Sequence, residues 1–298
     1  MYRLGLDIGG TQIGSGIVDG EGRLLGKSRL SVECVTDVFA EIKSAVASLA
    51  ASIGIPSENI LSCGVGIPGT VSEDGRRVLL APNIAILSEN FADDLEKALG
   101  IPVRMVQDSR AAALGEYLAG AGKGKKALVC VTLGTGIGTG IVLGGRIYHG
   151  ALGAAGELGH LPVVENGREC GCGKNGCVEK YCAGRGLAIS AEELLGEGKG
   201  CFELFREAEG GNAKAKAVID DAVVILGRAL TAIVNLLSPD ALLFSGGLSK
   251  EEALYLNPLI DYVSTHAYSS GKLPLLAKAA LGEDSPLVGA ALFPTTLE

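Results

Sequence analysis

The sequence predicts an α/β fold that is built twice, as two domains. The first observation is a repeat, since LGLDIGGTQIGSGIV at residues 4–18 is similar to VCVTLGTGIGTGIV at residues 129–142. The second is that short apolar strand patterns alternate with longer segments of helical spacing through both halves. A duplication of this kind predicts two α/β domains that face each other across a cleft, where a nucleotide would bind.

The first half is expected to open with three strands and to continue with alternating helices and strands. The turn DGEG at 19–22 predicts a hairpin, and Thr36 and Ser88 are the expected N-caps of two helices with apolar residues every three or four positions. The predicted strands are 2–7, 12–19, 23–30, 60–67 and 101–106, and the predicted helices are 36–53, 88–99 and an alanine-rich helix from 108.

In the second half, a strand from Ala241 is expected to end in the diglycine Gly246-Gly247 and to lead into a helix. The first domain should span residues 1–120 and the second residues 121–285, with a glycine-rich hinge near the boundary. The C-terminal helix, 286–298, is expected to return to the first domain. Further helices are predicted at 183–195, 201–208, 212–237 and 254–268, a glycine-rich hairpin at 129–142 and a strand at 275–279.

Composition restricts the possible function and compartment. The chain has 298 residues, a net charge of -8 and 47% hydrophobic residues, which argues against a nucleic-acid-binding surface. It shows no signal-peptide pattern and no apolar run of membrane-spanning length. Five of the eight cysteines are scattered singly through apolar segments, so we expect a reduced, cytoplasmic protein.

Two glycine-rich turns are candidates for nucleotide binding. In the run Asp7-Ile8-Gly9-Gly10-Thr11 a carboxylate at a strand end stands beside two glycines. Backbone N–H groups there could approach a phosphate while the acid faces its magnesium ion. An ordinary glycine-rich hairpin is the alternative. The diglycine Gly246-Gly247 could let a flat ring lie on the backbone, or could be a plain strand-to-helix turn.

A cluster of soft ligands lies between Glu157 and Cys177. Thiolate and imidazole donors suit zinc, and four protein ligands leave no open position, so the sequence predicts a structural zinc site. Buried or disulfide-bonded cysteines are the alternative, although three clustered cysteines leave one unpaired and Cys-x-Cys partners are strained. The predicted ligands are His160, Cys170, Cys172 and Cys177.

Asp108 stands where a strand gives way to the alanine-rich helix. Its carboxylate could cap that helix, or it could act as the general base that a kinase needs to accept the proton of an attacking hydroxyl. Two neighbours flank it. Gln107 offers amide donors and an acceptor to a ligand hydroxyl, and Arg110 could lie in solvent or bend back over the pocket.

These motifs together resemble the ROK family of bacterial sugar kinases and sugar-responsive repressors, most specifically in Glu-x-Gly-His followed by His-x9-Cys-x-Cys-x4-Cys. The resemblance implies the actin-like, ribonuclease-H-like duplicated fold, a homodimer, and transfer of the γ-phosphoryl group of ATP to a hexose or N-acetylhexosamine, at the 6-hydroxyl as in glucokinases. Asp108 would be the base. The implied sugar contacts are Asn83, Gln107, Asp108, Glu157, His160 and Glu179. The implied contacts to ATP and Mg²⁺ are Asp7, Gly9, Gly10, Thr11, Gln12, Gly134, Thr135, Gly136, Gly138, Gly246 and Gly247.

Several positions depart from the family pattern. The usual Asn-Asp-x-Asn is Gln107-Asp108-Ser109-Arg110 here, Gln12 replaces a frequent lysine, and the chain has no tryptophan. We therefore expect a sugar pocket that depends on hydrogen bonds rather than aromatic stacking. The alternatives to a kinase are a non-catalytic sugar sensor and a repressor. Family repressors have an N-terminal helix-turn-helix, whereas the first strand is expected here from Tyr2.

Overall fold

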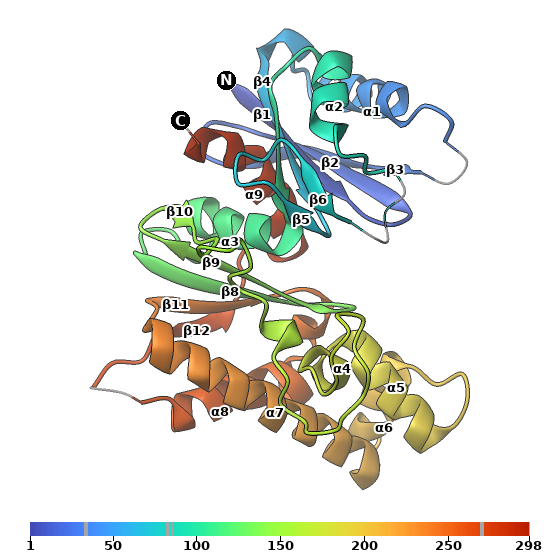
Figure 1. Cartoon of the computed structure of the whole chain (residues 1–298), viewed down its shortest axis with the longest axis vertical. Helices are drawn as coiled ribbons and strands as arrows, with labels where there is room; N and C mark the ends of the chain where they lie inside the picture. The colour runs from blue at the N-terminus through green and yellow to red at the C-terminus, as the bar shows by residue number, and fades with distance from the viewer. Residues whose placement is uncertain (33–34, 82–83, 85, 269–270, 298) are drawn as a thin grey trace. The chain divides into compact units, whose positions relative to one another are not determined.

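The computed structural model describes residues 1–32, 35–81, 84, 86–268 and 271–297, and it confirms the predicted duplication (Figure 1). One five-stranded sheet has the order β3-β2-β1-β4-β7, and the other has the order β10-β9-β8-β11-β12. Numbered along the chain within each sheet, both sets of strands are arranged 3-2-1-4-5. In both sheets the third, fourth and fifth strands of this order pair in parallel.

The elements have the following bounds. The first sheet contains β1 (Tyr2–Ile8), β2 (Gln12–Val18), β3 (Leu24–Ser31), β4 (Ile60–Ile67) and β7 (Val103–Gln107), and a small separate sheet contains β5 (Thr70–Val71) and β6 (Val78–Leu80). The second large sheet contains β8 (Ala127–Leu133), β9 (Ile137–Leu143), β10 (Arg146–Ile147), β11 (Ala241–Ser245) and β12 (Leu275–Lys278). The α-helices are α1 (Val38–Ser52), α2 (Phe91–Leu99), α3 (Asp108–Ala119), α4 (Glu179–Cys182), α5 (Gly184–Leu195), α6 (Cys201–Glu209), α7 (Ala213–Leu237), α8 (Asn257–His266) and α9 (Ser285–Leu292).

The chain divides into two compact units. The first comprises Met1–Lys126, Gly140–Ala155 and Ala279–Glu298, and the second comprises Ala127–Thr139 and Gly156–Lys278. This division differs from the predicted one mainly because residues 140–155 belong to the first unit. The expected hinge at 120–124 is a series of tight turns, in which the amides of Gly120 and Gly122 donate to the carbonyl of Glu116 at 3.1 and 2.9 Å.

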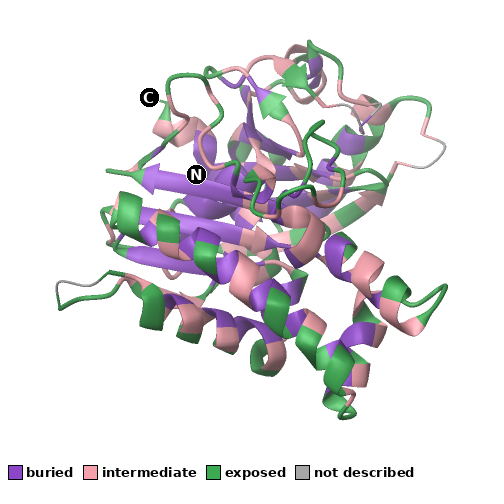
Figure 2. Cartoon of the chain, turned by 60° about the horizontal axis from the view of Figure 1, so that its bottom comes forward, coloured by how far each residue is buried: buried purple, intermediate pink, exposed green. Residues whose placement is uncertain are grey.

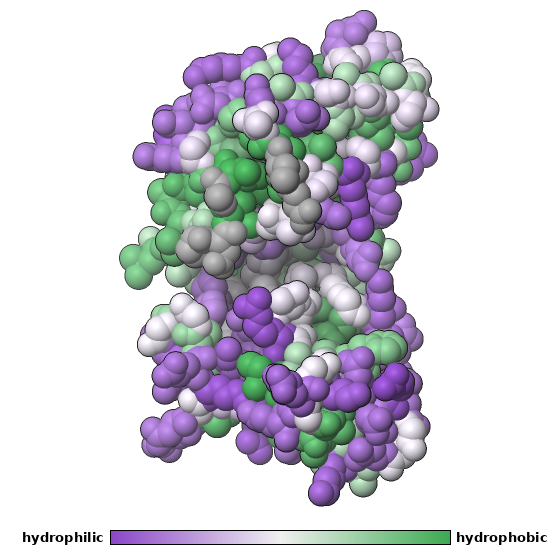
Figure 3. All heavy atoms as spheres, turned by 90° about the vertical axis from the view of Figure 1, so that its right-hand side faces the viewer, coloured by the Kyte–Doolittle hydropathy of each residue, from purple (hydrophilic) through white to green (hydrophobic). Residues whose placement is uncertain are grey.

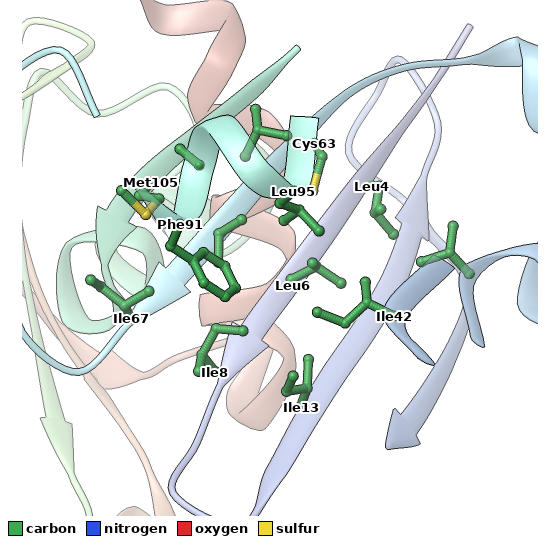
Figure 4. Close-up of a cluster of buried hydrophobic side chains, with 14 of the residues drawn as sticks. Leu4, Leu6, Ile8, Ile13, Ile42, Cys63, Ile67, Phe91, Leu95 and Met105 are labelled. Carbon is green, nitrogen blue, oxygen red and sulfur yellow. The ribbon is translucent and has the colours of Figure 1, made fainter. Parts of the chain in front are cut away.

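The core of the first unit lies on one face of its sheet (Figure 4). Successive strand residues point to opposite faces, so alternate residues of β1 meet the apolar faces of α1 and α2 on the same side. Figure 4 shows this cluster, whose labelled members are Leu4, Leu6, Ile8, Ile13, Ile42, Cys63, Ile67, Phe91, Leu95 and Met105, all fully buried. Burying one such side chain contributes roughly 1.5 to 3 kcal/mol, so this cluster is a major source of stability.

Glycines let helix α9 pack closely against the opposite face of the first sheet. A Cβ atom on Gly5 of β1 would lie 2.1 Å from the carbonyl oxygen of Leu287, and one on Gly64 of β4 would lie 1.6 Å from that of Ala290. Helix α9 also meets α3 closely, since a Cβ on Gly289 would lie 1.7 Å from the carbonyl oxygen of Ala111. The C-terminal segment is therefore an integral layer of the first unit.

The surface and the helices follow the ordinary pattern of a globular α/β protein. Inner strands such as β4 and β11 are largely buried, and helices such as α1 and α7 expose one side (Figure 2). Hydrophilic side chains predominate on the face in Figure 3, with smaller hydrophobic groups between them. Among the helices of the described residues, none is both long enough and apolar enough to cross a membrane.

Two predicted N-caps were wrong, and the helix predicted after the diglycine is not an α-helix at its start. Asp37, not Thr36, caps α1, because its carboxylate accepts from the amide of Ala40 at 3.1 Å. Helix α2 begins after Asn90 without a side-chain cap, so Ser88 lies outside it. The diglycine is followed by a 3₁₀ turn (Gly247–Lys250) and a π-helical turn (Glu252–Leu256) before α8, rather than directly by an α-helix.

The buried carboxylate of Glu116 links three segments of the first unit. It is fully buried in α3. One of its oxygens accepts from the amides of Ala121 and Ala280 at 2.9 and 3.0 Å. The other accepts from the amide of Leu281 at 2.8 Å and the hydroxyl of Ser285 at 2.7 Å. These four donors hold the residues that lead into α9.

We expect Glu116→Gln to lower the free energy of unfolding by about 2 to 5 kcal/mol. The amide nitrogen cannot accept, so two of the four buried donors lose their acceptor, and each unsatisfied group costs about 1 to 3 kcal/mol. Urea unfolding would measure the change, with exposed Glu58→Gln as the matched control. A loss below about 0.5 kcal/mol, as expected for an ordinary surface position, would contradict this role.

Candidate functional site

Two carboxylates lie at the ends of parallel strands in the first unit, one at the end of β1 and one directly after β7, with β4 between them. Asp7 of β1 is paired with Gly66 of β4, and Ile67 of β4 is paired with Gln107, the residue before Asp108. A Cβ on Gly66 would lie 3.5 Å from Asp7 Oδ1 and 3.8 Å from Asp108 Cα. The glycine therefore leaves space between the two acids. Carboxyl ends of parallel strands are common ligand sites in open α/β sheets.

The turn after Asp7 is tight and open to solvent. The amide of Gly9 donates to the carbonyl of Gln12 at 2.8 Å, and Gly10, Thr11 and Gln12 are exposed. Burial raises the pKa of Asp7 above its ordinary value, although the charge of Arg29 opposes this. Burial disfavours the ionised form of this carboxylate, so a nearby cation would stabilise that form. The donor type and the open turn thus fit a magnesium ion bound to phosphate.

Asp108 is the first residue of α3, not its N-cap. The N-cap is Gln107, which makes no side-chain capping bond. Asp108 Oδ1 accepts from the amide of Ser109 at 2.6 Å, so the carboxylate lies at the positive end of the helix dipole. It is half-buried, as is Gln107. The capping interpretation of Asp108 therefore loses support, and its role as a base stays a prediction.

The predicted position of Arg110 in solvent was wrong. The side chain is only 3% exposed and binds residues of the loop after β10. Its guanidinium donates to His149 Nδ1 at 2.9 Å and to the carbonyls of Gly153 and Ala155 at 2.6 and 3.2 Å. No signal in the sequence connects these positions, since the partners lie 39 to 45 residues away.

In the second unit, Glu179 supports the second glycine-rich turn. Its Oε2 accepts from the amide of Ile137 at 2.9 Å, and a Cβ on Gly136 would lie 2.4 Å from the same oxygen. The amide of Gly184 donates to the carbonyl of Gly134 at 2.9 Å, while Thr135 is exposed and Gly138 lies in β9. Glu179 is predicted to contact the sugar, and it also supports the turn that is predicted to contact the nucleotide.

The four predicted zinc ligands come together. Their ligand atoms all lie within 4.8 Å of one another. His160 Nδ1 is 3.5 Å from Cys170 Sγ, and the Sγ atoms of Cys172 and Cys177 are 3.6 Å apart. Two thiolates at about 2.3 Å from a tetrahedral zinc would be about 3.8 Å apart. The donor set and its spacing therefore fit a zinc ion, and the alternative of disulfide-bonded cysteines is not supported, because all three thiols are free.

The thiols of this cluster differ in their acidity. Burial and, to a smaller extent, the neighbouring thiols of Cys172 and Cys170 together raise the pKa of Cys177 to about 12. The pKa of Cys172 is lowered, chiefly because the amide of Lys174 donates to its sulfur. Cys177 is buried whereas Cys172 is exposed, so a cation at the cluster would have to hold the inner thiol as a thiolate.

Two glycines shape the loop that presents the cluster. Gly173 and Gly176 have positive φ angles of 84° and 76°, and a Cβ on Gly176 would lie 1.8 Å from the carbonyl oxygen of Val164. Gly171 has neither a positive φ nor a close neighbour, so its position does not require glycine. Isolated bridges from Pro162 to Cys177 and from Glu169 to Asn175 close the loop.

Glu157 and His160 lie at the two ends of one short turn. Residues Leu158–His160 form a 3₁₀ turn, in which the amide of His160 donates to the carbonyl of Glu157 at 3.1 Å. A Cβ on Gly159 would lie 2.5 Å from the carbonyl oxygen of Ile137, so the turn packs tightly on β9. Because His160 directs Nδ1 toward Cys170, its Nε2 is left for another partner.

Two predicted sites remain. Gly246 has a φ of 88°, and a Cβ there would lie 2.4 Å from the carbonyl oxygen of Leu133, whereas Gly247 is exposed with open space around its Cβ position. This leaves an accessible backbone surface at the end of β11, as a flat ring would require. Asn83 lies outside the described residues.

Comparison with known proteins identifies relatives along the whole chain. Residues 3–296 match the model of the ROK family. The chain is 34% identical to a glucokinase of Streptomyces coelicolor, over 97% of this chain and 96% of the relative, and 30% identical to an N-acetyl-D-glucosamine kinase of Pectobacterium atrosepticum, over 97% of both. It is also similar to the structure of a ROK family glucokinase from Streptomyces griseus in complex with glucose and AMPPNP, with a TM-score of 0.81, 34% identity, and coverage of 98% of this chain and 99% of that one. These matches confirm the predicted actin-like fold of two domains.

Proposed function

Because the chain belongs to the ROK family, we propose that it is an ATP-dependent sugar kinase that phosphorylates a hexose or N-acetylhexosamine, at the 6-hydroxyl. The pair of strand-end carboxylates, Asp7 and Asp108 on either side of Gly66, is the observation that supports this most strongly. Phosphoryl transfer needs one acid for the metal that accompanies the phosphates and another for the attacking hydroxyl. The glucokinase and N-acetylglucosamine kinase relatives support the substrate class.

In this proposal Asp108 is the general base. Its carboxylate orients the sugar hydroxyl and accepts its proton while the hydroxyl oxygen bonds to the γ-phosphorus of ATP. The bond between that phosphorus and the β–γ bridging oxygen breaks, so that ADP leaves and the sugar phosphate forms. Gln107, next to the base, offers an amide to a neighbouring hydroxyl of the sugar.

ATP and Mg²⁺ would be held by the glycine-rich turns. Asp7 would face the magnesium ion, which neutralises charge on the phosphates. The exposed backbone near the ends of β1, β8 and β11 would meet the nucleotide. The residues proposed for this role are Asp7, Gly9, Gly10, Thr11, Gln12, Gly134, Thr135, Gly136, Gly138, Gly246 and Gly247.

The sugar would be held by hydrogen bonds, two of them from the residues Glu157 and His160 next to the metal-binding cysteines. Glu157 is exposed and His160 half-buried, and we assign sugar contacts to both, together with Glu179 and Asn83. His160 would bind zinc through Nδ1 and a sugar hydroxyl through Nε2. Zinc at His160, Cys170, Cys172 and Cys177 would have a structural role, because four protein ligands close its coordination.

A coupled assay would test this function. The purified protein with ATP and Mg²⁺ should release ADP only when a sugar is added, from a panel of aldoses, ketoses and N-acetylhexosamines. Saturable sugar binding by calorimetry without ADP release would instead identify a non-catalytic sensor. Sedimentation of the same sample would test the proposed homodimer.

A further inference from the structure

A positively charged side chain lies in line with Asp7 on the first sheet. Asp7 of β1 is opposite Gly14 of β2, and Gly14 is in turn opposite Arg29 of β3. Residues that are opposite each other in antiparallel strands point to the same face, so Asp7 and Arg29 share one face with a glycine between them. Burial is the larger influence on the pKa of Asp7 and raises it, whereas the positive charge of Arg29 lowers it.

Helix α9 covers this face of the sheet at the next row of residues, but not at the row of Asp7. In the next row, a Cβ on Gly16 would lie 2.5 Å from Leu287 Cδ2 of α9. A Cβ on Gly14 would have only atoms of Asp7 within 4 Å among the described residues outside its chain neighbours, the nearer of them at 3.7 Å. Gly14 has no positive φ, so the backbone does not require glycine there. Its effect is to leave open space between the two charged side chains.

The charge of Arg29 has no partner within the part of the chain that the structure describes. Its side chain is exposed and makes no hydrogen bond or ion pair with those residues. Lys27, on the same strand and the same face, is in contrast bound to both carboxylate oxygens of Asp284, at 2.7 and 2.9 Å. The two glycine-rich turns, 7–12 and 134–138, contain no lysine or arginine. Arg29 is therefore a cation available to a ligand beside the first turn.

The chemistry of phosphoryl transfer gives such a cation a role. Positive groups as well as magnesium are needed to stabilise charge on the transferring phosphates, and backbone N–H groups supply only partial charges. A guanidinium can donate two parallel charge-assisted hydrogen bonds to phosphate oxygens. Neighbouring strands are about 4.8 Å apart, so β1 and β3 are about 10 Å apart at this row. This separation leaves room for a metal ion and phosphate oxygens between Asp7 and Arg29.

Protection of the sheet edge is the alternative role of Arg29. Strand β3 is the edge strand of its sheet, and an exposed cation on an edge strand discourages pairing with another sheet. That role requires only a charge in solvent, and it predicts no change in nucleotide binding when the charge is removed. It does not account for the alignment of Arg29 with Asp7 or for the open space at Gly14.

We propose that Arg29 binds the β- and γ-phosphates of ATP, across Gly14 from Asp7, an assignment that rests on the proposed kinase function. Asp7 then faces the magnesium ion on one side of the phosphates, and the guanidinium meets their oxygens on the other. Gly14 keeps the space between them free. The expected effect of Arg29 is on the nucleotide and not on the sugar.

Calorimetric titrations of MgATP and of AMP, which lacks both phosphates, would test this. Arg29→Ala should weaken MgATP binding by about 10-fold to 100-fold, as expected for the loss of charge-assisted hydrogen bonds, and should leave the Kd of AMP and of the sugar nearly unchanged. Arg29→Lys should recover part of the loss, because lysine keeps the charge without the fork of donors. Gly14→Val should also weaken MgATP binding selectively, since its side chain would enter the open space, while β-branched residues suit strands.

Lys27→Ala is the matched control, because it removes a cation from the same face of β3 whose charge is already bound by Asp284. It should leave the Kd of MgATP unchanged. Equal losses in Lys27→Ala and Arg29→Ala, an equal loss of AMP and MgATP affinity, or an unchanged MgATP Kd in Arg29→Ala would overturn the proposal. Sugar-dependent ADP release by the native protein would leave the kinase function standing in each of these cases.

Failure of the kinase function has a different signature. Native protein that binds MgATP but phosphorylates no sugar would remove that function, and the same titrations would still decide whether Arg29 binds the phosphates. Native protein that binds no MgATP would overturn both. Circular dichroism of each variant would verify that its fold is intact.

Discussion

Replacing Asp108 by Asn should lower the turnover of sugar and ATP by about 100-fold to 10,000-fold, the range that a general base contributes. The amide keeps the size and position of the side chain but cannot accept the hydroxyl proton. The fold and ATP binding should persist, because Asp108 is the first residue of α3 and the N-cap is Gln107. ADP release under saturating sugar, with circular dichroism and calorimetric ATP binding, would measure these quantities.

A suitable control for this variant is Asp94→Asn. Asp94 is also an acid in the first turn of a helix, α2, and its exposed carboxylate is bound only weakly to Lys97 at 3.1 Å. It should keep full turnover. If Asp108→Asn behaved like this control and lost only the roughly 0.3 to 1 kcal/mol of stability expected from the helix dipole, the carboxylate would serve the helix and another group would be the base.

The second large effect is expected for Cys172→Ser, which should remove zinc and weaken sugar binding together. Loss of a partner outside the ligand shell already costs about 10-fold to 100-fold in metal affinity, so loss of a ligand should exceed about 100-fold. Cys172 is exposed, so the substitution leaves the core packing intact. The link to the sugar is His160, which would bind both. Elemental analysis of protein purified without added metal should find about one zinc per chain.

Cys201→Ser provides the matched comparison for the zinc prediction. Cys201 is a half-buried thiol of α6 outside the cluster, so this variant should keep zinc and sugar affinity. Native protein that contains no metal and is fully active would show that the cluster has no role in the reaction. A variant that loses zinc but keeps its sugar Kd would separate the metal from the sugar site and remove His160 from the proposed contacts.

Features with a local cause were predicted well from the sequence. Strand β4 was predicted at 60–67 and is observed as Ile60–Ile67, because its run of apolar residues is bounded by turn residues on both sides. The cluster of His160 with three cysteines was predicted because the ligands lie within eighteen positions and glycines separate them. Helix starts were less certain, since Thr36 and Asp37 are both good N-caps and only the backbone geometry selects Asp37.

The sequence by itself determined the duplicated α/β architecture, the metal-binding loop and the acids at the strand ends, because periodicity, turn residues and ligand spacing act over short stretches of chain. The partners of buried charged side chains, in contrast, depend on the tertiary structure. Glu116 binds Ser285 169 residues away, and Arg110 binds His149 39 residues away. Their partners depend on which segments the fold brings together, and a buried charge is stable only where enough donors or acceptors converge on it.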